Sequence, residues 1–148
     1  MIVHFTVPGE PQGKGRPRFS KTANYVRTYT PANTASYENL VKVEYQRLYG
    51  TARFADEELL DMRIFAFFAI PKSASKKRKA QMQKNILRPV KKPDFDNIEK
   101  IIADSLNGVA YRDDTQIVDA IVRKFYSEIP RVEVFIRTAK EVSFREKY

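Results

Sequence analysis

Apolar and β-branched residues gather in four short stretches of the chain, and each stretch has the length and composition of a β-strand. The four stretches are residues 1–7, 60–70, 117–126 and 131–138. The last two are separated by Glu128, Ile129 and Pro130, and this short break predicts a β-hairpin between them. A further short strand is predicted around Tyr25 and Tyr29.

Two other segments carry the start and stop signals of helices. The first helix starts at Thr30-Pro31, where an N-cap residue precedes a proline suited to the first helical position. It is predicted to run to about residue 48, because Gly50 then ends it. The second is a basic helix expected over roughly residues 75–85.

A third helix is predicted from near Asp96 or Asn97 to the C-cap signal Asn107-Gly108. At 3.6 residues per turn, four polar residues fall within roughly 80° of one another. They are Asp96, Lys100, Asp104 and Asn107. The opposite side carries Ile98, Ile101, Ile102, Ser105 and Leu106. This amphipathic pattern predicts a helix that lies on a core and exposes its polar edge.

The elements follow one another in the order β, α, β, α, α, β, β. This order predicts an α/β fold of the α+β kind, with two layers in which helices cover one face of a mixed sheet. A chain of 148 residues with 43% hydrophobic and 12% aromatic residues is long enough to bury a core. No repeat or interdomain linker is visible, so we expect a single domain over residues 1–148.

Carboxylates are dense around the third helix. They are Asp94, Asp96, Asp104, Asp113 and Asp114. If the backbone is extended at Asp94 and Asp96, their side chains leave from one face, because alternate residues of a strand share a face. Acids that converge on one site raise one another's pKa unless a divalent cation neutralises them. Ligands that are all oxygen suit Mg²⁺ or Mn²⁺, so the segment is a candidate metal site.

Each of these acids also has a purely structural interpretation. Asp96 or Asn97 would serve as a helix N-cap, and Asp96 with Lys100 would form an i,i+4 ion pair. Asp113 and Asp114 would form the turn before a strand that begins at Ile117. The metal site is favoured over these alternatives because the acids occur together.

Positive charge is distributed unevenly. The chain has 27 Lys and Arg against 18 Asp and Glu, a formal net charge of +9, which favours a polyanionic partner. Residues 71–93 contain no acid and lead directly into the carboxylates; their basic residues are Lys72, Lys76, Lys77, Arg78, Lys79, Lys84, Arg88, Lys91 and Lys92. Such a block draws phosphates toward acids that would otherwise repel them. The alternative is a solvated basic loop or helix.

A loop rich in glycine and proline spans residues 8–17 and contains or adjoins Lys14, Arg16 and Arg18. Glycines let backbone approach a ligand closely and arginines bind phosphate, so the loop is a candidate DNA contact; a structural turn is the alternative. Tyr25 and Tyr29 are candidates for stacking on unpaired bases, with core packing as their alternative.

Some chemistries are excluded by composition. The chain has no cysteine and a single histidine, His4, so thiolate catalysis, zinc fingers and histidine-rich metal sites have no ligands here. The absence of cysteine fits a reducing compartment. No segment approaches 18 apolar residues, and the N-terminus lacks the layout of a signal peptide. We therefore expect a cytoplasmic protein without a membrane partner or a small-molecule cofactor.

The run PDFDNIEKIIADSLNGVAYRDDTQIVD resembles the signature of the RusA family of Holliday junction resolvases, in which D-x-D-N-x-x-K and a helix precede D-D-x-Q-[IV]. The run GEPQGKGRPRF near the N-terminus resembles the opening of phage and prophage members. Together the two matches span about residues 5–125. The central match is specific, because it requires several polar residues at defined spacings.

The resemblance implies a role for each matching acid. Asp94, Asp96 and Asp114 correspond to the metal-binding carboxylates, and Lys100 corresponds to the essential lysine. Asp113 adjoins Asp114, and neighbours on a strand point to opposite faces, so one of the pair is expected at the metal and the family favours the second. Asp104 also matches a family acid and could hold Lys100 in place through an i,i+4 pair.

The resemblance also implies a function. It implies a Mg²⁺-dependent endonuclease, with Mn²⁺ as a substitute, that resolves four-way DNA junctions by paired symmetric nicks in recombination and repair. Such cuts are related by two-fold symmetry, so a homodimer is expected. Two alternatives remain: a less selective nuclease for flaps, forks or other branched DNA, and a basic DNA-binding protein whose acids have no catalytic role.

Overall fold

The computed structural model of the chain describes residues 1–15, 18–22, 25–29 and 31–142, with backbone only at 18–20, 22, 25 and 27–29. Its strands are β1 (Ile2–Pro8), β2 (Arg18–Thr22), β3 (Tyr25–Tyr29), β4 (Leu60–Ala69), β5 (Ile117–Ser127) and β6 (Arg131–Thr138). Its helices are α1 (Ala32–Tyr49), α2 (Lys76–Gln83), α3 (Phe95–Ser105) and the short 3₁₀ helix η1 (Asp114–Gln116). Every predicted helix and strand is present, and the short strand expected around Tyr25 and Tyr29 is β3.

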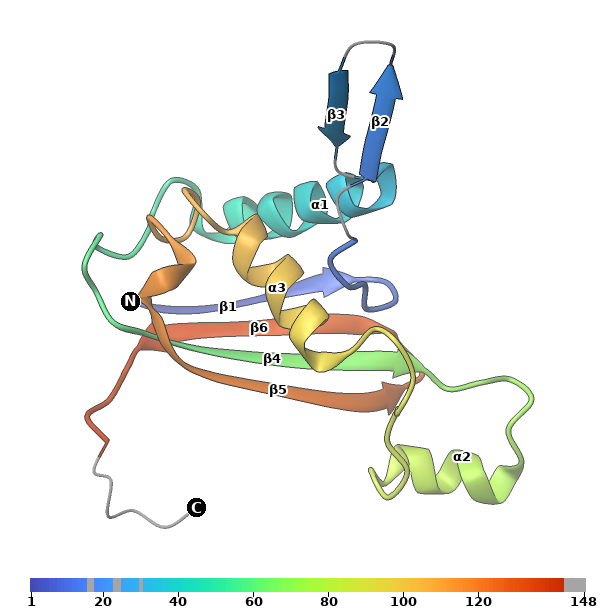
Figure 1. Cartoon of the computed structure of the whole chain (residues 1–148). Coiled ribbons are helices and arrows are strands. Elements are labelled where there is room, and N and C mark those ends of the chain that lie inside the picture. The colour runs from blue at the N-terminus through green and yellow to red at the C-terminus, as the bar shows by residue number, and fades with distance from the viewer. Residues whose placement is uncertain (16–17, 23–24, 30, 143–148) are drawn as a thin grey trace.

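A mixed sheet of four strands in the order β1-β6-β4-β5 forms the centre of the fold (Figure 1). The strands β4 and β5 are parallel, whereas β6 is antiparallel to both β1 and β4. Val134 of β6 lies opposite Phe5 on one side and Ile64 on the other. The predicted fold class, a mixed sheet combined with helices, is confirmed.

The predicted β-hairpin between the last two strands is wrong, because β4 lies between β5 and β6. The strands β5 and β6 are therefore separated by two strand spacings, about 9.6 Å. The three residues that connect them span that distance at about 3.3–3.6 Å per residue. A short turn therefore bridges the end of β4, and β4 takes the central position because alternate residues along it are buried in the core.

The core lies between the sheet and the helices α1 and α3. The inward residues of β4 are fully buried or nearly so; they are Leu60, Met62, Ile64, Ala66 and Phe68. They face a layer that includes Ile98, Ile101 and Ile102 of α3, whose side chains are also fully buried. Each such side chain contributes roughly 1.5–3 kcal/mol of hydrophobic free energy. The predicted apolar side of the third helix is thus confirmed, and it fixes the direction in which the polar side points.

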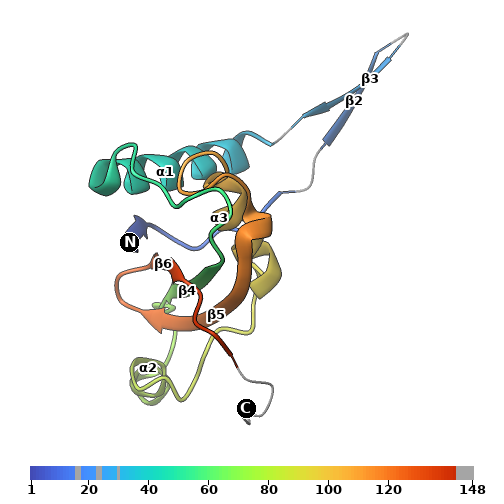
Figure 2. The ribbon, with the colours of Figure 1, turned by 90° about the vertical axis from the view of Figure 1, so that its left-hand side faces the viewer.

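Two elements stand apart from this core. The strands β2 and β3 pair with each other and project beyond α1 as a narrow arm (Figures 1 and 2). Helix α2 is capped by Ser75, whose side chain accepts a hydrogen bond from the Arg78 backbone N–H. The helix lies on the other side of the sheet from α1 and α3 (Figure 2). Within the described residues, no helix has both the length and the apolarity needed to cross a membrane.

Candidate functional site

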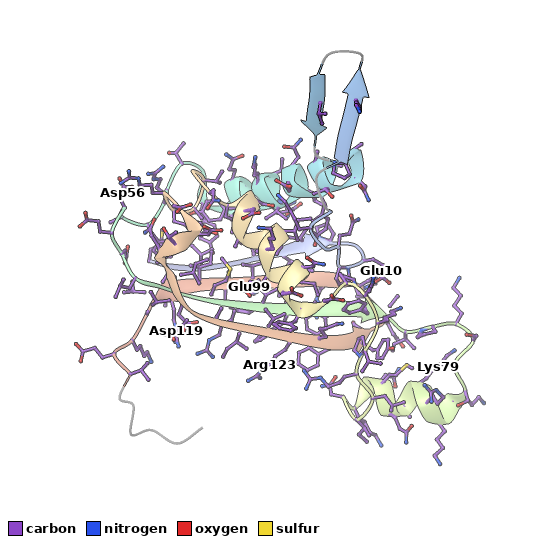
Figure 3. The ribbon with its side chains drawn as sticks, in the orientation of Figure 1. Glu10, Asp56, Lys79, Glu99, Asp119 and Arg123 are labelled. Carbon is purple, nitrogen blue, oxygen red and sulfur yellow. The ribbon has the colours of Figure 1, made fainter. Side chains whose placement is uncertain are left out.

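The polar side of α3 lines a shallow pocket of about 300 Å³ against the first half of β5. Three of the predicted site residues line it, namely Asp96 and Lys100 from α3 and Asp114 from η1. Asp104, from the third turn of α3, also lines this pocket. Glu99 of α3 and Asp119 of β5, both labelled in Figure 3, complete its charged lining.

Asp94 lies elsewhere. It lines a neighbouring hollow of about 670 Å³ together with residues of the N-terminal loop and with Lys92. The expectation of an extended backbone through Asp94 and Asp96 is wrong, because α3 starts at Phe95, before Asp96. Asp94 is the N-cap residue, yet its side chain makes no capping hydrogen bond, so its carboxylate remains available. Because α3 starts at Phe95, the N-cap is Asp94, and the expected N-cap role of Asp96 or Asn97 is wrong.

The adjacent acids Asp113 and Asp114 have different surroundings. Asp113 caps η1 in a capping box with Gln116, and the Thr115 hydroxyl donates to its carboxylate at 2.7 Å. That hydrogen bond holds the pKa of Asp113 below its ordinary value. Asp114 instead lines the pocket, and partial burial together with Asp104 and Asp113 raises its pKa. The structure therefore turns Asp114 toward the pocket and engages Asp113 in local structure.

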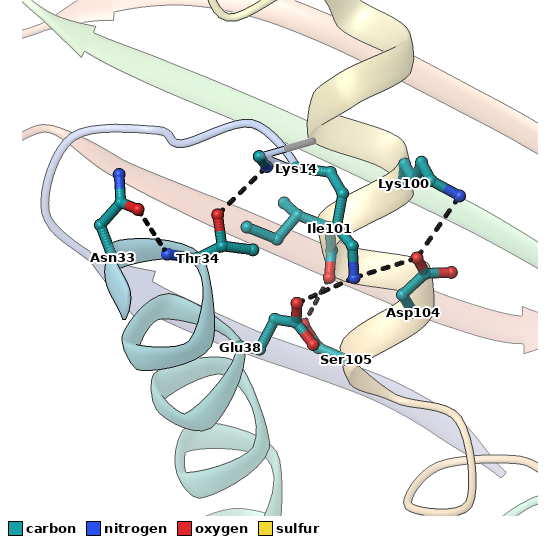
Figure 4. A network of polar contacts seen from close by, with 9 residues as sticks. Lys14, Asn33, Thr34, Glu38, Lys100, Ile101, Asp104 and Ser105 are labelled. Carbon is teal, nitrogen blue, oxygen red and sulfur yellow. Dashed lines mark hydrogen bonds and ion pairs between the residues drawn. The ribbon is translucent and has the colours of Figure 1, made fainter. Parts of the chain in front are cut away.

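Lys14 of the N-terminal loop joins the site from a distant part of the sequence (Figure 4). Its Nζ lies 2.8 Å from Glu38 Oε1 and 3.3 Å from Asp104 Oδ2. Lys100 Nζ lies 3.5 Å from the same oxygen of Asp104. Partial burial lowers the pKa of Lys14, but Glu38 and Asp104 outweigh this effect, and the pKa is raised.

These contacts assign partners to two predicted site residues. The expected i,i+4 pair between Lys100 and Asp104 is confirmed, whereas no ion pair joins Asp96 to Lys100 in the described part of the chain. Lys14, a predicted DNA contact, is already bound to two carboxylates and is mostly buried. Sequence reasoning missed Glu38, because nothing in the predicted helix over residues 31–48 marks one of its acids as the partner of a distant loop.

The N-terminal loop reaches the site by close backbone contact. The Lys14 N–H donates to the Asn97 carbonyl at 3.1 Å. A Cβ on Gly13 would lie 2.9 Å from Pro93 Cβ and 3.0 Å from Asn97 Cβ, closer than ordinary contact. Gly13 thus allows the loop to lie directly on the start of α3. The glycine pattern of the loop serves this packing at Gly13, which was one of the two readings left open by the sequence.

The basic block separates into two parts. Lys76, Lys77, Arg78 and Lys79 belong to α2 and lie on the other side of the sheet from α3 (Figures 2 and 3, with Lys79 labelled). Lys91 and Lys92 come directly before α3, and Lys92 lines the hollow that contains Asp94. Only this second part lies beside the predicted acids.

Lys124 of β5 is a further cation that the sequence did not single out. Its Nζ donates to the Lys91 carbonyl at 2.6 Å. Partial burial lowers the pKa of Lys124, and the charge of Asp94 acts in the opposite direction. Lys124 therefore lies within electrostatic reach of Asp94. A lysine within a strand carries no recognisable signal for such a role.

The donor set at this site has the right chemistry for a hard divalent cation. Asp96, Asp104 and Asp114 offer carboxylate oxygens at one pocket. Burial first, and then the nearby acids Asp104 and Asp113, raise the pKa of Asp114, and a bound cation would offset both effects. Within the described residues, however, no three carboxylate or imidazole groups already form a cluster that could hold a metal ion. Mg²⁺ often uses one or two protein carboxylates and takes its remaining ligands from water and substrate phosphate.

Comparison with known proteins identifies the family of this chain. The family described as Endodeoxyribonuclease RusA matches residues 8–137, a range that includes the N-terminal loop, α3 and η1. The chain is also 39% identical over 135 residues to the uncharacterised protein YqaN of Bacillus subtilis (strain 168), covering 91% of this chain and 95% of that protein. The chain therefore belongs to the RusA family of endodeoxyribonucleases, whose members are nucleases that act on DNA.

Proposed function

We propose that this protein is a Mg²⁺-dependent endonuclease that resolves four-way DNA junctions by paired symmetric cuts during recombination and repair. One observation carries the proposal: Asp96, Lys100 and Asp114, from two separate elements, line one pocket. Family membership supports a junction-resolving nuclease, and nucleases of this family generally depend on divalent metal ions.

Each residue has a proposed role. Asp96 and Asp114 would hold the metal at the pocket, and Asp94, from the neighbouring hollow, is proposed as a further ligand. The metal would supply Lewis-acid activation of water and stabilise charge on the phosphate. Lys100 stabilises the negative charge that develops on the phosphate oxygens in the transition state. Asp104 holds the Lys100 ammonium, 3.5 Å away, so that the lysine stays beside the pocket. Mn²⁺, with similar oxygen preference, is expected to replace Mg²⁺.

DNA contacts are proposed on either side of the acids. Lys91 and Lys92 are exposed beside the hollow that contains Asp94, where they would bind phosphates next to the cut strand. The α2 cations Lys76, Lys77, Arg78 and Lys79 would contact a more distant part of a branched substrate. Arg16 and the side chain of Arg18, also proposed to bind DNA, lie outside the described residues, as do the side chains of Tyr25 and Tyr29.

Symmetric cutting requires two copies of the site, so a homodimer is part of the proposal. Branch selectivity would then come from the geometry of the paired sites, because phosphate contacts position the DNA without reading its bases. A nuclease that cuts forks and flaps as readily as junctions would use the same acids with a different arrangement of subunits.

The test is cleavage of a labelled four-way junction beside a linear duplex and a three-way fork, in Mg²⁺ and in EDTA. Asp96→Asn is the active-site variant. Asp56→Asn is its control, since Asp56 is exposed and forms an ion pair with Arg53. Symmetric nicks confined to the junction, lost in EDTA and in Asp96→Asn but kept in Asp56→Asn, are the expected result. Equal cutting of all three substrates would indicate a general nuclease. Tight binding without cutting would contradict the nuclease proposal and favour a DNA-binding protein.

A further inference from the structure

Four side chains of alternating charge form a series that runs from helix α1 to the pocket (Figure 4). They are Glu38 of α1, Lys14 of the N-terminal loop, and Asp104 and Lys100 of α3. Lys14 Nζ lies 2.8 Å from Glu38 Oε1 and 3.3 Å from Asp104 Oδ2. Lys100 Nζ lies 3.5 Å from that same oxygen of Asp104. One carboxylate oxygen is therefore shared by two lysines that lie far apart in the sequence.

The four side chains differ in their exposure to water. The exposed fraction is 19% for Glu38, 20% for Lys14 and 22% for Asp104, but 60% for Lys100. Lys100 and Asp104 line the pocket, whereas Lys14 lines only the neighbouring hollow that contains Asp94. A phosphate in the pocket would thus meet the Lys100 ammonium directly, while Lys14 would act on it through Asp104.

Backbone contacts on both sides hold Lys14 in place. Its own N–H donates to the Asn97 carbonyl at 3.1 Å, near the start of α3. The next N–H, that of Gly15, donates to the Thr34 hydroxyl at 3.1 Å, near the start of α1. A Cβ on Gly15 would overlap this hydroxyl, so the backbone lies directly on α1 here. Lys14 is held between two helices, with a mostly buried side chain, and is not on a loop that is free to follow a ligand.

The shared oxygen affects how much positive charge Lys100 can offer to a ligand. An ammonium paired with a carboxylate attracts a phosphate less than a free ammonium does, because the two opposite charges partly cancel. Lys14 offsets the charge of Asp104, so less of the charge of Lys100 is cancelled. In the described part of the chain, Glu38 pairs with Lys14 and not with Lys100, so its charge acts at the other end of the series.

We propose that Lys14 is a positioning residue for Lys100. Lys14 binds Asp104, and Asp104 in turn holds the Lys100 ammonium beside the pocket with its charge available to the phosphate. The proposal rests on the proposed function, because the phosphate is that of the DNA strand to be cut. Lys14 then contributes to cutting without contact with DNA.

The first test separates the rate of cutting from DNA binding. Lys14→Met is expected to lower the single-turnover rate in Mg²⁺ by about 10- to 100-fold, the range typical for residues that orient the groups of a metal site. Lys140→Met is the control, since Lys140 is exposed and its loss removes the same charge. The two variants are expected to bind the junction equally in a gel shift in EDTA, and Lys140→Met is expected to cut like the wild type.

Folding is controlled in two ways. Circular dichroism checks that each variant is folded at the assay temperature. Lys14→Gln replaces Lys14→Met if the latter is too unstable, because its amide can still donate to a carboxylate while the charge is lost. The same direction of change is expected for both.

The second test is a double-variant cycle with Lys100. If Lys14 acts through Lys100, its replacement should cost little in a protein that already lacks Lys100. The rate of Lys14→Met combined with Lys100→Ala is therefore expected to lie within about twofold of the rate of Lys100→Ala alone, which is the usual error of additivity. A merely structural role of Lys14 would instead multiply the two losses.

The third test needs neither metal nor DNA. Reductive methylation with ¹³C-formaldehyde labels the lysines and keeps their charge, and NMR then reports the surroundings of each methylated ammonium. The Lys100 signal is assigned from its absence in Lys100→Ala. It is expected to shift in Lys14→Met and to stay in place in Lys140→Met.

A folded Lys14→Met variant that cuts at the wild-type rate would overturn the proposal. So would multiplied losses in the double-variant cycle, or a Lys100 signal that does not respond to Lys14→Met. A loss of junction affinity at an unchanged rate would also overturn it and make Lys14 a direct DNA contact. A wild type that cuts no DNA in Mg²⁺ would remove the proposed nuclease function, and a responsive Lys100 signal in that protein would leave the positioning of Lys100 by Lys14 standing.

Discussion

At the scale of single residues, the charge around the pocket is set by which carboxylates already have a partner. Asp104 is held by Lys14 and Lys100, and Asp113 is held by its cap contacts. Asp96 has no ion pair within the described residues, and the pKa of Asp114 is raised by burial and by neighbouring acids. The acids left for a metal are therefore those that lack a local structural role.

Asp96→Asn is predicted to abolish cutting while junction binding stays equal or becomes tighter. The amide cannot ligate the metal as a carboxylate does, and it removes a charge that repels phosphate. Single-turnover cleavage should fall by about 10²-fold or more, a size typical for the loss of one group that stabilises a transition state. Binding is measured by a gel shift in Ca²⁺ or EDTA. Full cleavage by this variant would show that Asp96 is not a metal ligand.

Lys100→Ala is predicted to reduce cutting by a similar factor, but with weaker binding. The variant removes a cation from a pocket whose other charged lining residues are acids. Lys84→Ala, an exposed lysine at the C-cap of α2, is the matched control for loss of one positive charge. Equal cleavage by the two variants would contradict a catalytic role for Lys100.

Lys14→Met is predicted to lower the free energy of unfolding by about 1–3 kcal/mol, because Glu38 and Asp104 would be left close together without their shared cation. The pKa of Lys14 is raised from 10.5, so its contribution is fully present below that pH and is lost as the pH rises through the higher folded value. Urea unfolding at about pH 8 and about pH 11 should show a difference between variant and wild type that shrinks at the higher pH. Lys72→Met, at an exposed position, should show no such difference.

At the scale of elements, the local patterns of the sequence were reliable and the long-range ones were not. The apolar spacing of Ile98, Ile101 and Ile102 predicted the buried side of α3, because 3.6-residue periodicity is a local property. The β5–β6 hairpin was wrong, because pairing with β4 is decided by burial far away in the sequence. Starting α3 at Phe95 also changed the relation of Asp94 to Asp96, since each helical residue turns about 100°.

Gly13→Ala is predicted to move the N-terminal loop off the start of α3. The added methyl would meet Pro93 and Asn97 at about 3 Å, and neither atom is the end of a flexible side chain. Overpacking of this kind typically costs 1–3 kcal/mol, and here it would also draw Lys14 away from Asp104. The stability measured by chemical denaturation and the rate of junction cleavage should both decline. Gln12→Ala, at the exposed neighbouring position, should change both of them little. Unchanged stability of Gly13→Ala would mean that the loop does not lie against α3 in solution.

At the scale of the whole molecule, the fold separates two surfaces. The acids, Lys91 and Lys92 lie along α3 and the β5 edge, while the stacked rings of His4 and Phe135 lie on the other side of the sheet. The sequence alone located the basic block but could not divide it, because the chain between α2 and α3 passes from one side of the sheet to the other (Figure 2).

The division of the basic block predicts different salt dependences of junction binding. Each phosphate contact contributes about 0.9 to the slope of log affinity against log salt concentration. The double variant Lys91→Ala and Lys92→Ala should reduce the slope by up to about 1.8, since both cations lie beside the Asp94 hollow. Salt screens the attraction between exposed charges that lie more than about 8–10 Å apart. The double variant Lys76→Ala and Lys77→Ala should therefore reduce the slope only if the DNA arms reach α2. An unchanged slope for the Lys91 and Lys92 variant would contradict the placement of DNA along α3. A reduced slope for both double variants would require a junction whose arms extend around the end of the sheet.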